Sequence, residues 1–132
     1  MIATPDIEVT RTSRSAIAIG VFRIVVALLF LIHGTAKVFG YPGGSALPAG
    51  SWPAWWAGVL ELVLGAMIAI GLYARSAAFI ASGTMAVAYF WMHFPRGFWP
   101  LANGGEPAVL YCFIFLLIVF IGPGAFAVSR RF

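Results

Sequence analysis

Four long apolar segments alternate along the chain with short segments rich in glycine, proline or charge. The first begins near Ile17 and ends at the cluster Gly40-Tyr41-Pro42-Gly43-Gly44, which strongly disfavours helix. Each segment is too long for a typical strand of about five or six residues, so a helix is the better interpretation. The pattern predicts helices over residues 17–39, 52–72, 77–94 and 106–121.

Local sequence signals support these boundaries. Ser51 is placed to cap the second helix, and Pro53 is suited to its first turn. Pro95 and Gly97 are expected to stop the third helix and open an aromatic loop from 95 to 105. Glu106-Pro107 then begins the fourth helix, with an acidic residue where the helix dipole favours it.

The composition of the chain indicates that these helices belong to a membrane protein. The chain has 132 residues, of which 62% are hydrophobic and only 9% are charged, whereas soluble domains are about 45–50% apolar. A crossing needs about 20 mostly apolar residues, so a chain of this length has room for about four or five. We therefore predict an all-α membrane protein, a four-transmembrane-helix bundle. Its domains are a polar cytoplasmic tail over 1–15 and a single transmembrane domain over 16–132.

The distribution of charge predicts the orientation of this bundle. An even number of crossings places both termini on one side, and five arginines gather there: Arg11, Arg14, Arg75, Arg130 and Arg131. By the positive-inside rule both termini face the cytoplasm. The five tryptophans (Trp52, Trp55, Trp56, Trp91 and Trp99) then lie at the outer interface, where indole rings are favoured.

Several classes of function are excluded or disfavoured. Cys112 is the single cysteine, so the chain has no intrachain disulfide, no CxxC pair and no thiolate zinc site. We expect Cys112 to be a packing residue. Eight Lys and Arg residues are too few and too scattered to bind nucleic acid. We expect no metal site and no covalently bound cofactor.

Small residues recur at helical spacing on the second and third predicted helices. Such residues let helix backbones approach closely in lipid, where no hydrophobic effect drives helices together. We expect a packed bundle with these positions at helix contacts: Gly58, Gly65, Ala69, Ala78, Ser82 and Ala86.

The few ionisable groups inside the apolar segments carry the candidate chemistry. His33 and Lys37 are four residues apart and therefore share a helix face. Glu61 follows Trp52 by nine residues, which places it roughly 13 Å below the outer interface of a core about 30 Å thick. We expect a cavity that opens outward and narrows toward Glu61. Its predicted ligand-binding or proton-handling residues are His33, Lys37, Glu61, His93, Arg96, Asn103 and Glu106; the sequence names no catalytic residue.

Structural explanations compete with these roles. Glu61 could form a buried ion pair with Lys37 that fixes the register of the first two helices. A backbone carbonyl could satisfy His33, and His93 could be an amphipathic filler at the interface. Arg23 lies low on the first helix, and we expect its side chain to snorkel to the cytoplasmic surface.

The order of several motifs resembles the DoxX family of small four-helix membrane proteins. They are HGTAK at 33–37, Glu61 followed by LGAMIAIGLYAR, NGGE at 103–106 and GPG at 122–124. The positions that match recurring polar residues of the family are His33, Lys37, Glu61, Asn103 and Glu106. His93 and Arg96 come from the residue pattern alone. The chain departs from the family in ending with AFAVSRRF, where many members have an acidic ending.

The resemblance implies a multi-pass protein of the bacterial cytoplasmic (inner) membrane. The family is named for a subunit of a thiosulfate:quinone oxidoreductase. The leading hypothesis is therefore a subunit that binds a quinone or similar molecule in the outer-facing pocket; the candidate partners are an oxidoreductase subunit and further copies of the chain in a homo-oligomer. The alternatives are a non-enzymatic scaffold or assembly factor, and a small transporter. Catalysis by this chain alone stays an open question.

Overall fold

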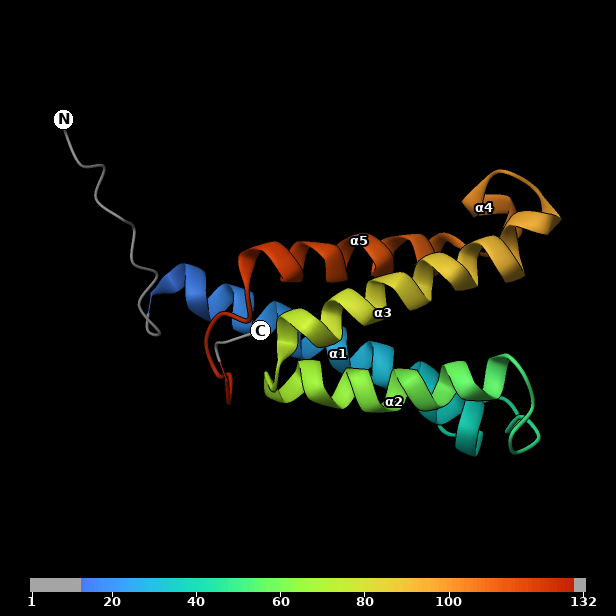
Figure 1. Ribbon diagram of the computed structural model, residues 1–132, viewed down its shortest axis with the longest axis horizontal. Coiled ribbons are helices and arrows are strands. Elements are labelled where there is room, and N and C mark those ends of the chain that lie inside the picture. Colours follow the sequence, from blue (N-terminus) through green and yellow to red (C-terminus); the bar gives the residue numbers. More distant parts are fainter. Residues whose placement is uncertain (1–12, 130–132) are drawn as a thin grey trace.

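The computed structural model describes residues 13–129, and this part of the chain is helical with no strands. Four long helices run side by side, as Figure 1 shows. A one-turn π-helix, a one-turn 3-10 helix and a short α-helix connect the third long helix to the last. In chain order the elements are α1 (Arg14–Phe39), α2 (Ala54–Ile70), α3 (Ala74–Ala88), η1 (Tyr89–His93), η2 (Phe94–Arg96), α4 (Pro100–Asn103) and α5 (Glu106–Ile121).

The long helices form two pairs. α1 packs against α2 and α3 packs against α5, while α2 and α3 connect the pairs through fewer contacts. A core of buried apolar residues joins the four helices, with Phe30, Ile68, Phe115 and Ile118 at its centre. Across the α3–α5 contact, the Ser82 hydroxyl donates a hydrogen bond of 2.8 Å to the Cys112 carbonyl.

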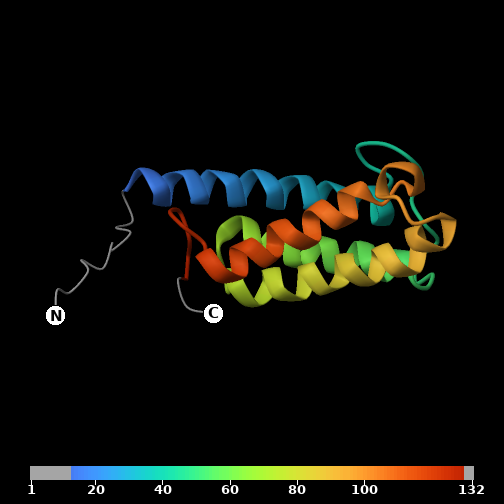
Figure 2. The same ribbon diagram turned by 90° about the horizontal axis from the view of Figure 1, so that it is seen from above.

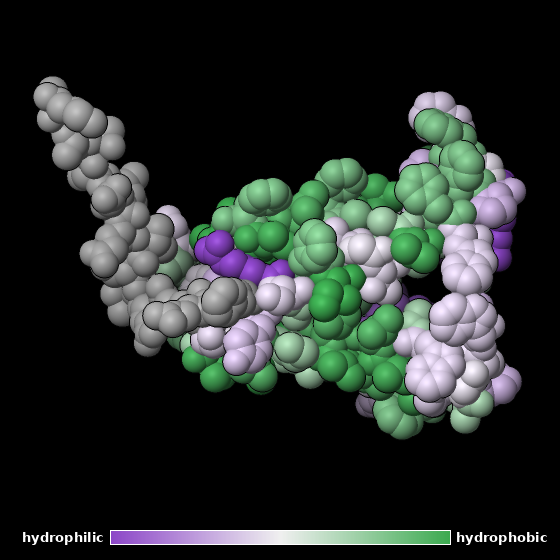
Figure 3. All heavy atoms as spheres, in the orientation of Figure 1, coloured by the Kyte–Doolittle hydropathy of each residue, from purple (hydrophilic) through white to green (hydrophobic). Residues whose placement is uncertain are grey.

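The two ends of the bundle differ in composition. One end, called here the tryptophan end, consists of the α1–α2 connection, the first turn of α2 and the segment from η1 to α4, which together carry all five tryptophans. The opposite end holds the start of α1, the α2–α3 turn and the segment after α5 (Figure 2). Arg14 and Arg75 lie at this opposite end. Exposed apolar side chains, called here the apolar belt, cover the face shown in Figure 3 between the two ends, and each of the four long helices carries some of them.

Two helices are long and apolar enough to cross a membrane by length and composition: Arg14–Phe39, of 26 residues, and Ala74–Arg96, of 23 residues. The other two long helices are also apolar but shorter, at 17 residues for α2 and 16 for α5.

The observed helix starts differ from the predicted ones in three places. α1 begins at Arg14, inside the predicted tail of residues 1–15, because the Ser13 hydroxyl accepts a hydrogen bond from the Ala16 N–H (3.1 Å). The remainder of that tail, residues 1–12, lies outside the described residues, as do Arg11, Arg130 and Arg131. α2 begins at Ala54 rather than 52, with Pro53 and not Ser51 in the capping position. α3 begins at Ala74 rather than 77.

The segment after α3 is more regular than expected. The helix predicted to end at 94 continues through η1 and η2 to Arg96, and Gly97 follows with a positive φ of 140°. The expected aromatic loop from 95 to 105 contains the short helix α4. The residues predicted for the last helix, 106–121, are those of α5.

Glycines set the close contact between α1 and α2. A Cβ at Gly34 would lie 2.7 Å from the Gly58 carbonyl oxygen, and a Cβ at Gly58 would lie 2.8 Å from the Lys37 Cβ. Further along, a Cβ at Gly65 would lie 3.1 Å from the Leu31 Cβ. Side chains at these positions would therefore push the helices apart, and their absence brings Lys37 directly against α2.

Arg23 corrects an expectation from the sequence. Its side chain does not snorkel to the surface, because the residue is fully buried. The guanidinium donates hydrogen bonds to the carbonyl oxygens of Pro123, Ala125 (3.0 Å) and Phe126 (2.8 Å). The segment after Gly122 folds back across α1, as Figure 1 shows, and places these carbonyls within hydrogen-bonding distance of Arg23.

This C-terminal segment is held to both helices of the first pair. Ala125 N–H donates to the Ala16 carbonyl at 2.8 Å, and Val128 N–H donates to the Ile70 carbonyl at 3.1 Å. A Cβ at Gly20 would lie 2.5 Å from the Ala125 carbonyl oxygen, so this glycine is required for the close approach. The segment therefore closes the end of the bundle opposite the tryptophans.

Replacing Arg23 with methionine should lower the free energy of unfolding by about 2–4 kcal/mol, because buried carbonyls lose a charged donor. The midpoint of thermal unfolding in detergent measures this loss. Hydrogen exchange at the Ala125 and Val128 amides should accelerate as well. Arg14→Met, at the exposed start of the same helix, is the control. Equal stability of the two variants would contradict this account of Arg23.

Candidate functional site

A cavity of about 230 Å³ lies within the bundle toward the tryptophan end. All four long helices contribute to its walls, as do η1 and the turn before α5. Its lining combines apolar side chains with four ionisable ones and a phenol: Phe30, His33, Lys37, Glu61, Met85, Ala88, His93, Gly104, Pro107, Ala108 and Tyr111.

An ion pair between α1 and α2 forms one wall of this cavity. Lys37 Nζ donates to Glu61 Oε1 at 2.6 Å. Glu61 follows Gly58 by one helical turn and so faces α1 where that glycine lets Lys37 approach. The structure therefore contains the register-fixing pair that the sequence left as an alternative to a binding role.

The two partners of this pair are buried to very different degrees. The Glu61 side chain is 2% exposed, whereas that of Lys37 is 35% exposed. Glu61 Oε1 accepts from Lys37, but Oε2 has no hydrogen-bond partner among the described residues. A carboxylate oxygen can accept more than one hydrogen bond, and leaving it buried without any is costly. The Oε2 atom of Glu61 can thus accept a further hydrogen bond beside the cavity.

His33 lies on α1, one turn before Lys37, and lines the cavity close to α5. Its ring meets the Tyr111 ring edge-on, with 5.7 Å between centroids. Tyr111 in turn stacks on Phe115 and contacts Phe30, both in the core. Sequence analysis missed Tyr111 because a single phenol in an apolar helix has no distinctive spacing; its only signal was that it is the sole tyrosine on the last predicted helix.

The π-helix places His93 at the cavity. Here α3 widens over Tyr89–His93, a geometry that recurs at functional sites. The His93 Nδ1 atom lies 3.2 Å from the Asn103 carbonyl oxygen, and the ring stacks on Tyr89. A backbone carbonyl thus orients this imidazole, while its side chain still lines the cavity.

Asn103 is buried, but its side-chain amide is committed to the surrounding loop. Nδ2 donates to the Gly97 carbonyl (2.9 Å) and to the Tyr89 hydroxyl (3.3 Å), and Oδ1 accepts from the Gly105 N–H (2.8 Å). These bonds hold the connection between η2 and α5 in shape. Asn103 therefore supports the cavity wall without lining the cavity itself.

Two lateral grooves adjoin the cavity. The first, called the α2–α3 groove, has a volume of about 430 Å³ and shares Lys37, Ala88 and His93 with the cavity. The second, called the α1–α5 groove, has a volume of about 370 Å³ and shares His33, Pro107 and Tyr111. The cavity is thus flanked by grooves between the two helix pairs.

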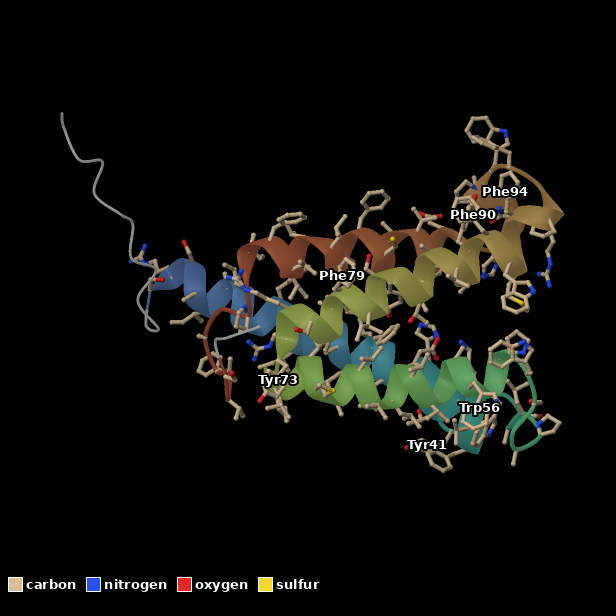
Figure 4. All side chains as sticks on the ribbon, in the orientation of Figure 1. Tyr41, Trp56, Tyr73, Phe79, Phe90 and Phe94 are labelled. Carbon is tan, nitrogen blue, oxygen red and sulfur yellow. The ribbon has the colours of Figure 1, made fainter. Side chains whose placement is uncertain are left out.

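The remaining two predicted site residues lie in these grooves and not in the cavity. Arg96 is exposed and lines the α2–α3 groove, and Glu106 is exposed and lines the α1–α5 groove. Figure 4 shows the side chains of this region, with Trp56 on the α2 side and with Phe90 and Phe94 directed away from α2. Four of the predicted site residues therefore line the cavity: His33, Lys37, Glu61 and His93. The other three lie near the cavity but outside its lining: Arg96, Asn103 and Glu106.

Across residues 13–129, no three His, Cys, Asp or Glu side chains come together in a way that could hold a metal ion.

Comparison with known proteins identifies the family of the chain. The DoxX family model matches residues 18–94, more than half of the chain. The chain belongs to the DoxX family. This DoxX protein is 46% identical over 117 residues to an uncharacterized protein of Haemophilus influenzae, a match that covers 83% of this chain and 87% of that protein. No solved structure matches it.

The DoxX match includes the ion pair and both histidines at the cavity, but not Asn103, Glu106 or Tyr111. Membership in this membrane-associated family agrees with the two helices long enough to span a bilayer. The apolar belt is therefore a lipid-contacting surface.

The unequal burial of the ion pair predicts unequal effects of removing each partner. Lys37→Met leaves a buried carboxylate without its cation and should cost about 3–5 kcal/mol. Glu61→Gln should cost less, because Lys37, whose side chain is 35% exposed, can still reach water. Chemical or thermal unfolding in detergent measures both, and the double variant Lys37→Met/Glu61→Gln should recover part of the loss. Equal costs for the two single changes would show that burial does not govern this pair.

Proposed function

We propose that this DoxX protein crosses the bacterial inner membrane four times, with both termini in the cytoplasm. Arg14 and Arg75 at one end of the bundle and the tryptophans at the other support this orientation. α2 has 17 residues and α5 has 16, so each rises roughly 25 Å. Shorter helices are accommodated by local thinning of a bilayer core about 30 Å thick.

The proposed activity is binding of a quinone or a similar small molecule in the cavity at the outer half of the bundle. One observation carries this proposal: Glu61 Oε2 is a buried acceptor that no group of the described chain satisfies, and Glu61 lines the cavity. A ligand hydroxyl can donate to this oxygen. A hydroquinone has such hydroxyls, and its oxidised form has carbonyls that accept instead.

The other cavity groups supply the complementary donors. The Lys37 ammonium and the imidazoles of His33 and His93 can donate to carbonyl oxygens of the oxidised ring. An imidazole nitrogen can donate or accept a proton, so these side chains can also exchange protons with a bound hydroquinone. The same cavity can therefore hold both redox forms of one ligand.

Electrons exchanged with the bound quinone pass to or from a partner subunit. Oxidation of the hydroquinone releases two protons and two electrons, and the cavity groups accept protons only. The chain thus serves as the quinone-binding subunit of an oxidoreductase, and the partner supplies the redox centre.

Cysteine accessibility tests the topology. In a Cys112→Ala background, Ser45→Cys places a thiol in the exposed α1–α2 connection and Ser76→Cys places one near the α2–α3 turn. A membrane-impermeant maleimide should label Ser45→Cys in cells whose inner membrane is intact. It should label Ser76→Cys only after that membrane is opened. Labelling of both positions from the same side would rule out the proposed crossings of α2.

Ligand binding is tested with the ubiquinol headgroup that lacks a side chain. Glu61→Gln should weaken its binding by about tenfold, because a hydrogen bond to a charged acceptor is worth about 1–1.5 kcal/mol more than one to a neutral acceptor. Isothermal titration with the purified protein in nanodiscs measures the affinity, and Glu8→Gln in the predicted tail is the matched control. Absence of binding to the wild-type protein would instead favour the scaffold role.

A further inference from the structure

The α2–α3 groove combines an apolar wall with a polar inner end. α2 contributes Ala57 and Leu60, and α3 with η1 contributes Val87 and Met92. Lys37 and His93 lie where the groove meets the central cavity. A molecule that occupied both spaces would therefore need one polar part and one apolar part.

Gly83 gives this groove its depth. It lies in the middle of α3 and lines the groove, and a Cβ built on it meets nothing within 4 Å. Glycine inside a helix costs about 1 kcal/mol relative to alanine. Gly58 and Gly65 are explained by the close approach of α1, but no neighbouring helix requires a glycine at 83. The open space in front of Gly83 is therefore free for a ligand.

The groove opens sideways between its two helices. Trp52, before α2, and Trp91, in η1, both line it, and their rings meet edge-on with 6.1 Å between centroids. The two walls thus touch at the tryptophan end. Figure 3 shows a gap between the helix pairs on the inner side of this end. A ligand in the groove would enter from the lipid and not from the water above the tryptophans.

The charges along the groove and in the cavity determine which kind of ligand head group can bind there. The α2–α3 groove has Lys37, His93 and Arg96 in its lining and no carboxylate. At the inner end, however, Glu61 presents an unpaired oxygen that repels phosphate and carboxylate groups and attracts a donor. An uncharged head with hydroxyl groups fits this end, whereas the head of a phospholipid does not.

We propose that the α2–α3 groove holds the single apolar chain of a membrane-soluble ligand whose uncharged, hydroxyl-bearing ring occupies the central cavity. This inference rests on the proposed function and adds the class of substrate, a ring with one alkyl or prenyl chain, and its entrance from the lipid. The α1–α5 groove, which contains Glu106, is not the site of the chain.

A photoreactive probe tests this assignment. The probe is the ubiquinol headgroup with a decyl chain that ends in a diazirine, and the protein is the full chain in phosphatidylcholine nanodiscs. After illumination and proteolysis, mass spectrometry should find the label on groove residues such as Leu60, Thr84 and Val87. Unlabelled decylubiquinol should compete for this labelling.

Variants at position 83 provide the matched comparison. Gly83→Ala adds a single methyl group to the groove and should reduce labelling less than a larger side chain does. Gly83→Leu fills the groove and should reduce labelling there by about tenfold, equivalent to about 1.4 kcal/mol of binding free energy. Val87→Trp is a second filling variant at an exposed position. Leu110→Trp fills the α1–α5 groove and should leave the labelling unchanged.

The headgroup without a chain separates the two proposals. Its Glu61-dependent binding should persist in Gly83→Leu. Label on Leu29, Leu110 or Ile114, or unchanged labelling in both filling variants, would overturn the groove assignment while the cavity remained the binding site. Loss of Glu61 dependence for the headgroup itself would overturn the proposed function and the groove assignment together.

Discussion

The salt bridge between Lys37 and Glu61 is the contact on which the rest of the site depends. It joins two helices inside an apolar bundle, where a charge without a partner would be expelled or neutralised. Its geometry requires Gly58, since any larger residue would move Lys37 away from α2. Because only Oε1 of the carboxylate is used, the same contact that stabilises the helix pair leaves an acceptor facing the cavity. Structural and binding roles for this pair are therefore compatible.

The two ends of the bundle differ in structure: one is closed by hydrogen bonds, and grooves lie toward the other. At one end, Arg23 and the backbone of the C-terminal segment fill the space between the helix pairs with hydrogen bonds. At the other end the pairs are held by a smaller set of contacts, including the Trp52–Trp91 pair, and grooves remain between them. The bundle is therefore closed by hydrogen bonds at one end and hollowed by grooves toward the other.

Sequence analysis predicted the elements well where local chemistry decides them. The end of α1 at the Gly40 cluster and the range of α5 follow from glycine, proline and an acidic first turn. The approach of Lys37 and Glu61 was one of two alternatives, because helical spacing gives the face of a residue but not the partner of that face. Which candidates bind a ligand stays a prediction.

Features that depend on distant parts of the chain could not be predicted in this way. Arg23 reaches carbonyls about a hundred residues later in the sequence, and nothing near it signals a segment that folds back. Asn103 was grouped with the cavity by its position near the outer interface, yet its amide serves its own loop. The open space in front of Gly83 could not be predicted either, because a helical glycine at a tight contact and one at an open groove look alike in sequence.

The position of Arg23 also has a consequence for biogenesis. The carbonyls that Arg23 binds belong to residues 123–126, about a hundred residues later in the chain, so they are synthesised well after the helix that carries it. Until then its guanidinium needs substitute acceptors, such as lipid headgroups or the insertion machinery. The native hydrogen bonds of Arg23 can therefore form only after residues 123–126 have been synthesised, later than the helix that contains this arginine.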